Sequence, residues 1–151
     1  MLGADVTLTD QPNILPLTEH NVGETIARSK DSGATGLSAD KIRVREYMWG
    51  TDLAPLGPPF DLILASDVAY DHRAVSPLVS TLEATLAAAA AAGKDSSVLL
   101  AYRCSDVLTP ETLKAERKFF STLTGTFAVA EAQLRSTVEH VQLYSLLPRP
   151  S

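Results

Sequence analysis

The sequence predicts an α/β domain built around a mostly parallel sheet. Segments with strand-like and helix-like apolar spacing alternate along its 151 residues. Within the segment 60–65, the residues from Leu62 to Ala65 form a continuous apolar run, which is typical of a strand covered on both faces of a parallel sheet. The last two strand-like segments are separated by only a few residues, which indicates an antiparallel pair at the end of the chain.

The N-terminal half is expected to contain two strands and one helix. Residues 5–9 fit a short strand that ends at Asp10, and residues 12–27 have the apolar spacing of a helix. The polar segment 29–40 contains two glycines and is expected to be a loop. Residues 41–46 alternate polar and apolar side chains, as a half-exposed strand does.

The C-terminal half is expected to contain two helices and four strands. Helically spaced apolar residues and a run of alanines predict a first helix that extends from Leu78 to Gly93. Thr109 and Pro110 are a typical N-cap and first residue of a second helix, over 110–123. The predicted strands are 60–65, 98–102, 126–132 and 138–147.

The composition indicates one soluble globular domain, because 45% of the residues are apolar and 21% are charged. The net charge of −5 argues against a nucleic-acid-binding surface. The single cysteine, Cys104, favours a reducing compartment such as the cytosol or the nucleus. The longest apolar stretch, residues 86–92, is too short to span a bilayer, and the N-terminus lacks the basic and apolar regions of a signal peptide.

Polar and aromatic side chains follow the predicted strands, at the edge where open α/β sheets bind ligands. An aspartate there can accept hydrogen bonds from a ribose, and an indole offers a flat face on which an adenine stacks with roughly 1–3 kcal/mol. These residues are Asp10, Trp49, Ser66, Asp67 and Arg103. The sequence therefore predicts a nucleotide-like ligand at this edge.

Each of these residues also has a simpler structural explanation. Asp10, which precedes Gln-Pro, is a common turn residue, and Asp67 could cap the helix that follows it. Trp49 and Tyr70 could pack as ordinary core aromatics. The three histidines lie in different segments without the spacing of metal ligands, so the sequence predicts no metal site.

Four stretches occur in an order that resembles the seven-β-strand S-adenosylmethionine-dependent methyltransferases: GADVTLTD, VREYMWG, FDLILASDVAYD and VLLAYR. The closest resemblance is to the protein-lysine methyltransferase-like family with a D-x-x-Y motif, whose members modify chaperones and related ATPases. Here that motif is formed by Asp67-Val68-Ala69-Tyr70. The resemblance implies a Rossmann-like sheet with an antiparallel C-terminal strand, S-adenosylmethionine as methyl donor, and a protein substrate.

The resemblance also implies a role for each candidate residue. Asp10 is expected to hold the ribose of the donor, and Trp49 to pack on its adenine. Ser66 and Asp67 are expected to lie beside the methionine part, and Tyr70 to line the channel that admits the lysine. Asp67 and Tyr70 are expected to orient the neutral amine for in-line transfer of a methyl group from a sulfonium, without a metal.

The sequence departs from this family at its N-terminus. The family's sheet order is 3-2-1-4-5-7-6, and its central strand 1 leads into a G-x-G loop beside the donor. The eight glycines of this chain never form G-x-G, and the first predicted strand corresponds to strand 2. We therefore expect a single, incomplete domain without the first βα unit, in which strand 2 either pairs with strand 4 or leaves two open sheet edges.

Two consequences of this departure are expected. The fold is expected to be marginal, less secure over 5–46, and these 151 residues alone are expected to transfer methyl groups poorly. A non-catalytic remnant or protein-binding module with the same fold is the alternative function. A nicotinamide-dependent oxidoreductase, with Asp10 on the cofactor ribose, is a further alternative, but it explains neither Trp49 nor the D-x-x-Y motif.

Overall fold

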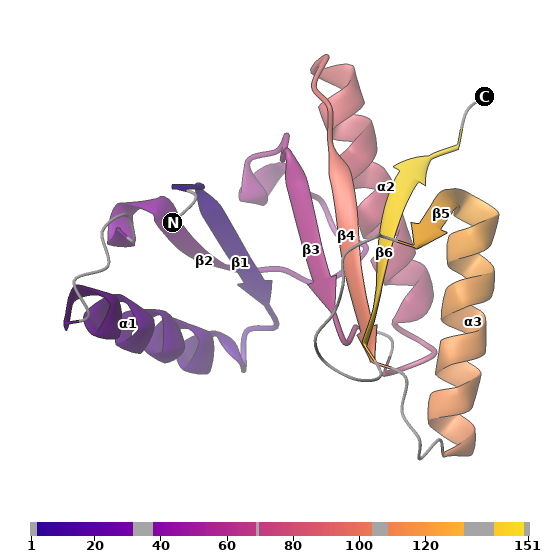
Figure 1. The fold of residues 1–151 in the computed structure, drawn as a ribbon, viewed down its shortest axis with the longest axis horizontal. Coiled ribbons are helices and arrows are strands. Elements are labelled where there is room, and N and C mark those ends of the chain that lie inside the picture. Colours follow the sequence, from indigo (N-terminus) through magenta and orange to yellow (C-terminus); the bar gives the residue numbers. More distant parts are fainter. Residues whose placement is uncertain (1–2, 32–37, 69, 104–108, 132–140, 150–151) are drawn as a thin grey trace. The chain divides into compact units, whose positions relative to one another are not determined.

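The computed structural model describes residues 3–31, 38–68, 70–103, 109–131 and 141–149 (Figure 1). Its elements follow the predicted order β-α-β-β-α-β-α-β-β, so the predicted α/β class is confirmed. The chain divides into two compact units, Met1–Met48 and Trp49–Ser151, here called unit 1 and unit 2. Predictions that concern Cys104 and His140 lie outside the described residues, and a single domain over 1–151 stays a prediction.

Unit 1 contains a parallel pair of strands joined by one helix. Strand β1 (Val6–Asp10) pairs with β2 (Ile42–Glu46) from Val6↔Ile42 to Asp10↔Glu46, and α1 (Leu15–Asp31) connects them. The helix starts later than predicted, because the backbone carbonyl of Gln11 accepts hydrogen bonds from the N–H groups of residues 14 and 15 in a turn. Only two described residues of unit 1 are buried, Ser29 and Tyr47.

Unit 2 contains a four-stranded mixed sheet in the order β3-β4-β6-β5. Its strands are β3 (Leu62–Ser66), β4 (Ser97–Arg103), β5 (Phe127–Glu131) and β6 (Val141–Pro148). Strands β3 and β4 are parallel, whereas β6 is antiparallel to both β4 and β5. The predicted antiparallel pair at the end of the chain is therefore confirmed.

The described strands form two sheets, β1-β2 in unit 1 and β3-β4-β6-β5 in unit 2. The two arrangements expected for strand 2, pairing with strand 4 or open sheet edges, concern both units and stay predictions. With β1–β6 matched to family strands 2–7, the two sheets have the orders 2-3 and 4-5-7-6 that the resemblance implies.

Two helices of unit 2, α2 (Val75–Ala91) and α3 (Pro110–Thr126), contribute to one hydrophobic core with β4, β5 and β6. The side chains of Leu100, Phe119, Leu123 and Leu146 have no exposed surface. Thr109 caps α3 as predicted, because its Oγ1 accepts a hydrogen bond from the N–H of Thr112. Among the helices within the described ranges, none has the length and apolar character needed to cross a membrane.

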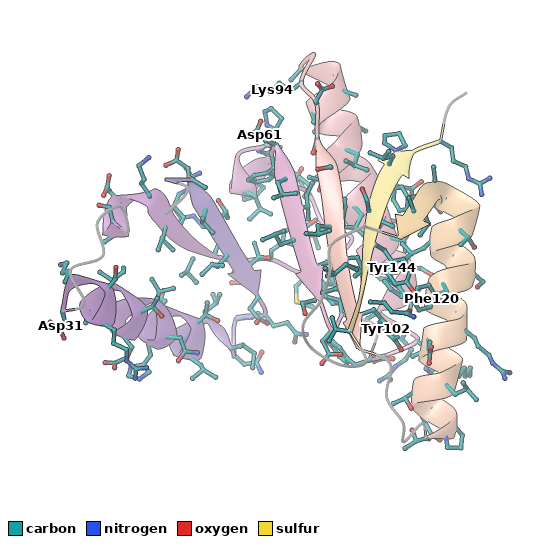
Figure 2. All side chains as sticks on the ribbon, viewed as in Figure 1. Asp31, Asp61, Lys94, Tyr102, Phe120 and Tyr144 are labelled. Atoms are coloured by element: carbon teal, nitrogen blue, oxygen red, sulfur yellow. The ribbon has the colours of Figure 1, made fainter. Side chains whose placement is uncertain are left out.

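An aromatic cluster joins α3 to the sheet. The ring of Phe120 meets those of Tyr102 on β4 and Tyr144 on β6 edge to face, at centroid distances of 5.1 and 5.5 Å (Figure 2). Such pairs add to the energy gained from burial of the rings themselves. This cluster fixes α3 against the two central strands, and α3 in turn contacts the loop described below.

The opposite face of the unit 2 sheet contradicts one prediction. Leu62 and Leu64 of β3 remain 53% and 71% exposed, whereas Ile63 and Ala65 contact the core. The prediction that β3 is covered on both faces is therefore wrong for the described residues. Since side chains alternate along a strand, the core takes every second residue of β3 and leaves the others in solvent.

Candidate functional site

The end of β3 places Asp67 in an unusual backbone conformation. Asp67 has a φ of 55°, which is the left-handed region, and its N–H donates to the carbonyl of Ala101 on β4 at 3.2 Å. Aspartate adopts this region more readily than most residues with a side chain, but at a cost in free energy. Such strained residues occur preferentially at functional sites. The carboxylate is exposed, and none of the described side chains pairs with it.

The structure argues against the simpler role for Asp67 as a helix cap. Helix α2 begins only at Val75, and its N-cap residue is Ala74. The turn before the helix is instead organised by Asp71, whose Oδ1 accepts the N–H of Arg73 at 2.8 Å. The Asp67 carboxylate is therefore not used to start the helix.

The loop between β3 and α2 is held at two further points. The Arg73 guanidinium donates to both carboxylate oxygens of Asp71 at 3.0–3.2 Å. Lys118 on α3 donates from Nζ to the backbone carbonyl of His72 at 2.8 Å. The first contact stiffens the loop itself, and the second attaches the segment that follows the D-x-x-Y motif to α3.

Arg73 holds the pKa of Asp71 below its ordinary value of 3.8, chiefly through the side-chain hydrogen bonds. Because the pKa is lowered on folding, this contact is fully present above about pH 3.8 and is lost as the pH falls through the lower folded-state value. In Arg73→Gln, an NMR titration of Asp71 is expected to give a pKa nearer its ordinary value, because the guanidinium hydrogen bonds are lost while the backbone N–H of residue 73 still donates. An unchanged low pKa in this variant would show that the backbone, not Arg73, causes the shift.

Trp49 and Tyr70 form an aromatic pair within unit 2. Their ring centroids lie 6.4 Å apart with an interplanar angle of 49°. Trp49 is half-buried against the core, whereas Tyr70 is 60% exposed. The structure therefore brings together two of the predicted site residues from segments that are separate in the sequence, and leaves one ring accessible to solvent.

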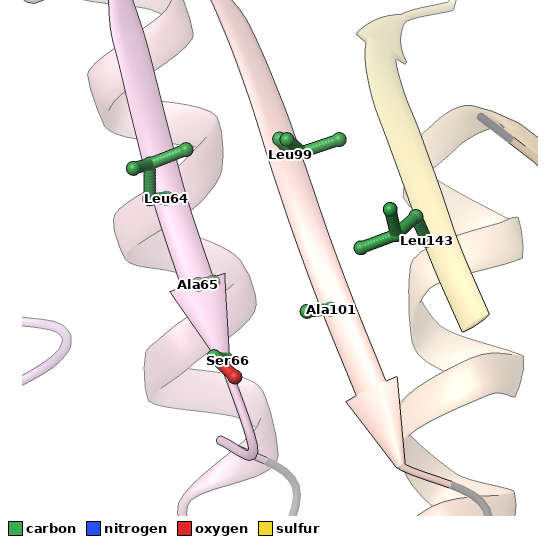
Figure 3. Close-up of a pocket in the computed structure, with 6 residues that line it drawn as sticks. All are labelled: Leu64, Ala65, Ser66, Leu99, Ala101 and Leu143. Atoms are coloured by element: carbon green, nitrogen blue, oxygen red, sulfur yellow. The ribbon is translucent and has the colours of Figure 1, made fainter. Parts of the chain in front are cut away.

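Ser66 is part of the lining of an apolar groove on the sheet (Figure 3). The groove has a volume of about 250 Å³. It is lined by Leu64, Ala65, Ser66, Leu99, Ala101 and Leu143. Since Asp67 follows Ser66 directly, a polar and charged end adjoins an otherwise apolar surface.

Asp10 lies at the end of β1 in unit 1. Its Oδ1 accepts the N–H of Gln11 at 2.8 Å, and its backbone carbonyl accepts the N–H of Tyr47 at 3.0 Å. The turn role is thus present, while Oδ2 accepts no hydrogen bond from the described residues. A ribose-binding role for Asp10 stays a prediction. Among the described residues, no three His, Cys, Asp or Glu side chains are grouped to hold a metal.

Several structural contacts of this region were not predicted from the sequence. Lys118 and Thr81, on helices α3 and α2, each bind a loop that is distant in the sequence. A helical lysine or threonine gives no local signal of such a contact, so only the tertiary structure identifies them.

A protein-family model described as lysine methyltransferase matches residues 1–126, a range that includes every predicted site residue. Protein N-lysine methyltransferase METTL21A of Danio rerio is 35% identical over 85 residues, which cover 55% of this chain and 35% of that protein.

Two further relatives give similar values. EEF1A lysine methyltransferase 3 of Xenopus tropicalis is 29% identical over 83 residues, covering 55% of this chain and 33% of that protein. Protein-lysine methyltransferase METTL21E of Bos taurus is 36% identical over 87 residues, covering 55% and 27%. The matches span about a third of the length of these curated relatives.

Proposed function

This chain belongs to the lysine methyltransferase family, and we propose that it serves the transfer of a methyl group from S-adenosylmethionine to a lysine side chain of a protein substrate. The observation that carries the proposal is the strained Asp67 at the end of β3, followed by Tyr70, whose ring lies beside Trp49. Family membership argues against the oxidoreductase alternative.

The described residues of unit 2 fit the donor in two respects. Trp49 is held against the core yet keeps part of its indole exposed, which suits stacking with adenine. Asp67 keeps a carboxylate without a described partner beside the apolar groove at Ser66. An acid without a described partner at a strand end suits the positively charged part of the donor, because charges of opposite sign attract.

The main task of the protein in this reaction is to align the amine with the methyl group. S-adenosylmethionine supplies a methyl group on a positively charged sulfur; the carbon–sulfur bond breaks as a carbon–nitrogen bond forms, and the nitrogen then releases a proton to water. Asp67 and Tyr70 accept and donate hydrogen bonds that orient the amine. Orientation of this kind contributes much of the rate in such reactions, because the entropy of alignment is lost before the reaction begins.

We propose that the substrate is a folded protein such as a chaperone, a related ATPase or an elongation factor. One relative is named for EEF1A, which supports a protein acceptor for this chain. The reaction is proposed to take place in the cytosol or the nucleus, and the single cysteine of the chain supports a reducing compartment.

Tyr70→Phe tests the proposed function with a minimal change. The variant keeps the ring beside Trp49 and removes only the hydroxyl, so methyl transfer is expected to fall by up to about tenfold, which corresponds to one lost hydrogen bond. The protein produced from its own gene is incubated with labelled S-adenosylmethionine and an extract of cells that lack the gene, and methyl-lysine is identified by mass spectrometry. Tyr144→Phe, which removes a hydroxyl within the aromatic cluster, is the control and is expected to keep full activity. Absence of methyl-lysine with the unchanged protein would contradict the proposal.

A non-catalytic, protein-binding module is the alternative that one observation favours. No G-x-G sequence occurs among the 151 residues. We propose that donor binding of full strength needs such a loop. In-frame translation of the DNA upstream of the Met1 codon tests this: a strand-like segment followed by G-x-G supports the enzyme, and a nearby stop codon favours the module.

A further inference from the structure

The residue that follows Trp49 is bonded to helix α2. The N–H of Gly50 donates to Oγ1 of Thr81 at 2.8 Å, across 31 positions of the sequence. This is a contact between a loop and the middle of a helix, and it joins the residue next to the indole to the main core of unit 2. Trp49 itself packs against the same core.

Glycine is strongly favoured at position 50. Its φ of 85° lies in the left-handed region, which disfavours any residue with a side chain. A Cβ at this position would lie 3.2 Å from Cβ of Pro77 on α2, which is tighter than an ordinary contact. The loop therefore approaches the helix closely at Gly50, next to its hydrogen bond with Thr81.

Thr81 uses both capacities of its hydroxyl. Oγ1 donates to the backbone carbonyl of Pro77 at 3.0 Å and accepts the N–H of Gly50. The first bond is the usual contact of a helical threonine with its preceding turn, and it aims the lone pairs of the oxygen toward the loop. Thr85, one turn later, has the same internal bond to the carbonyl of Thr81 at 2.7 Å. It is thus a matched helical threonine for comparison.

We infer that Thr81 and Gly50 are positioning residues that fix the indole of Trp49 beside Tyr70, and thereby set the affinity for the adenine of S-adenosylmethionine. The identity of the ligand rests on the proposed function, whereas the Gly50–Thr81 contact is observed in the structure. Without the Gly50–Thr81 hydrogen bond, the loop loses a direct link to α2 next to the indole. The Trp49 ring is then expected to move away from the core and from Tyr70.

The test uses the fluorescence of Trp49, which is the single tryptophan of the chain. Thr81→Val removes the hydroxyl at nearly constant size, Thr81→Ser keeps it, and Thr85→Val is the helical control. The acrylamide quenching constant of Trp49 is expected to rise about twofold in Thr81→Val, because a displaced indole is more exposed to solvent. In the other two variants it is expected to equal that of the unchanged protein. Thermal unfolding of each variant is recorded to show that unit 2 stays folded.

A titration with S-adenosylmethionine separates the two parts of the inference. Thr81→Val is expected to bind S-adenosylmethionine about tenfold more weakly than the unchanged chain does. Such a loss is typical when a base loses much of its stacking on an aromatic side chain. Thr81→Ser and Thr85→Val are expected to keep the affinity. Unchanged quenching in folded Thr81→Val would overturn the positioning role. If quenching increases in Thr81→Val but the unchanged chain does not bind S-adenosylmethionine, the positioning of Trp49 by Thr81 is supported and the proposed ligand is overturned.

Discussion

Phe119→Ala is expected to lower the free energy of unfolding of unit 2 by about 3–5 kcal/mol, the usual cost of removing a fully buried phenylalanine. Phe119 on α3 has no exposed surface and belongs to the main core of unit 2. Domains of this size are stabilised by only about 5–15 kcal/mol in total, so the variant is expected to be close to unfolding. Urea denaturation followed by Trp49 fluorescence measures this, because the indole packs against the same core.

Leu64→Ala is the matched control for this prediction. Leu64 is also a large apolar residue of unit 2, but it is 71% exposed. Its replacement is expected to change the free energy of unfolding by no more than about 0.5 kcal/mol. If Leu64→Ala lowers the free energy of unfolding as much as Phe119→Ala does, the side chain of Leu64 is covered in solution. That result would contradict the exposure described above.

Asp67→Asn is expected to reduce methyl transfer at least about 100-fold, because a misaligned amine and a lost charge act on the same step. Asparagine tolerates the left-handed backbone at this position nearly as well as aspartate, so the fold is expected to be retained. The rate is measured with the protein produced from its own gene, by incorporation of labelled methyl groups into protein lysines.

Two companion variants separate the carboxylate of Asp67 from its backbone. Asp67→Ala is expected to be less stable than Asp67→Gly by about 1–2 kcal/mol, because alanine disfavours the left-handed region and glycine does not. Both are expected to be as inactive as Asp67→Asn. Full activity of Asp67→Gly would show that the left-handed backbone at this position, and not the carboxylate, matters for the reaction.

The elements of the fold could be predicted because each has a local signal. Thr109 and Pro110 mark the start of α3, and the structure confirms the cap. The start of α1 was placed too early, since the turn at Gln11 competes with the helix and leaves the apolar pattern unchanged. The apolar run of β3 was interpreted as buried on both faces, but Leu62 and Leu64 are exposed. An apolar run in the sequence shows that the side chains are apolar. It does not show whether one face or both faces of the strand are packed against other elements.

The candidate site was predictable where residues follow strand ends, and not where it depends on tertiary contacts. Asp67 and Tyr70 were identified from a motif, and Trp49 from its place after a predicted strand. The left-handed backbone of Asp67 had no sequence signal, because most residues in this conformation are glycine or asparagine. The contacts of Thr81 and Lys118 with distant loops likewise depend on helix packing. The side chain of Arg103, another predicted strand-end residue, lies outside the described parts.

Titration of the 151-residue chain with S-adenosylmethionine, followed by the fluorescence of Trp49, tests the donor-binding role most directly. We expect a saturable change with a Kd of about 0.1–1 mM, which corresponds to about 4–5.5 kcal/mol of binding free energy and is modest because the chain has no G-x-G loop. S-adenosylhomocysteine is expected to compete, whereas ATP, which lacks the methionine part, is expected to compete poorly. Micromolar binding would contradict the need for a glycine loop. A Trp49 signal that does not saturate with S-adenosylmethionine would contradict the central claim that this chain binds the methyl donor.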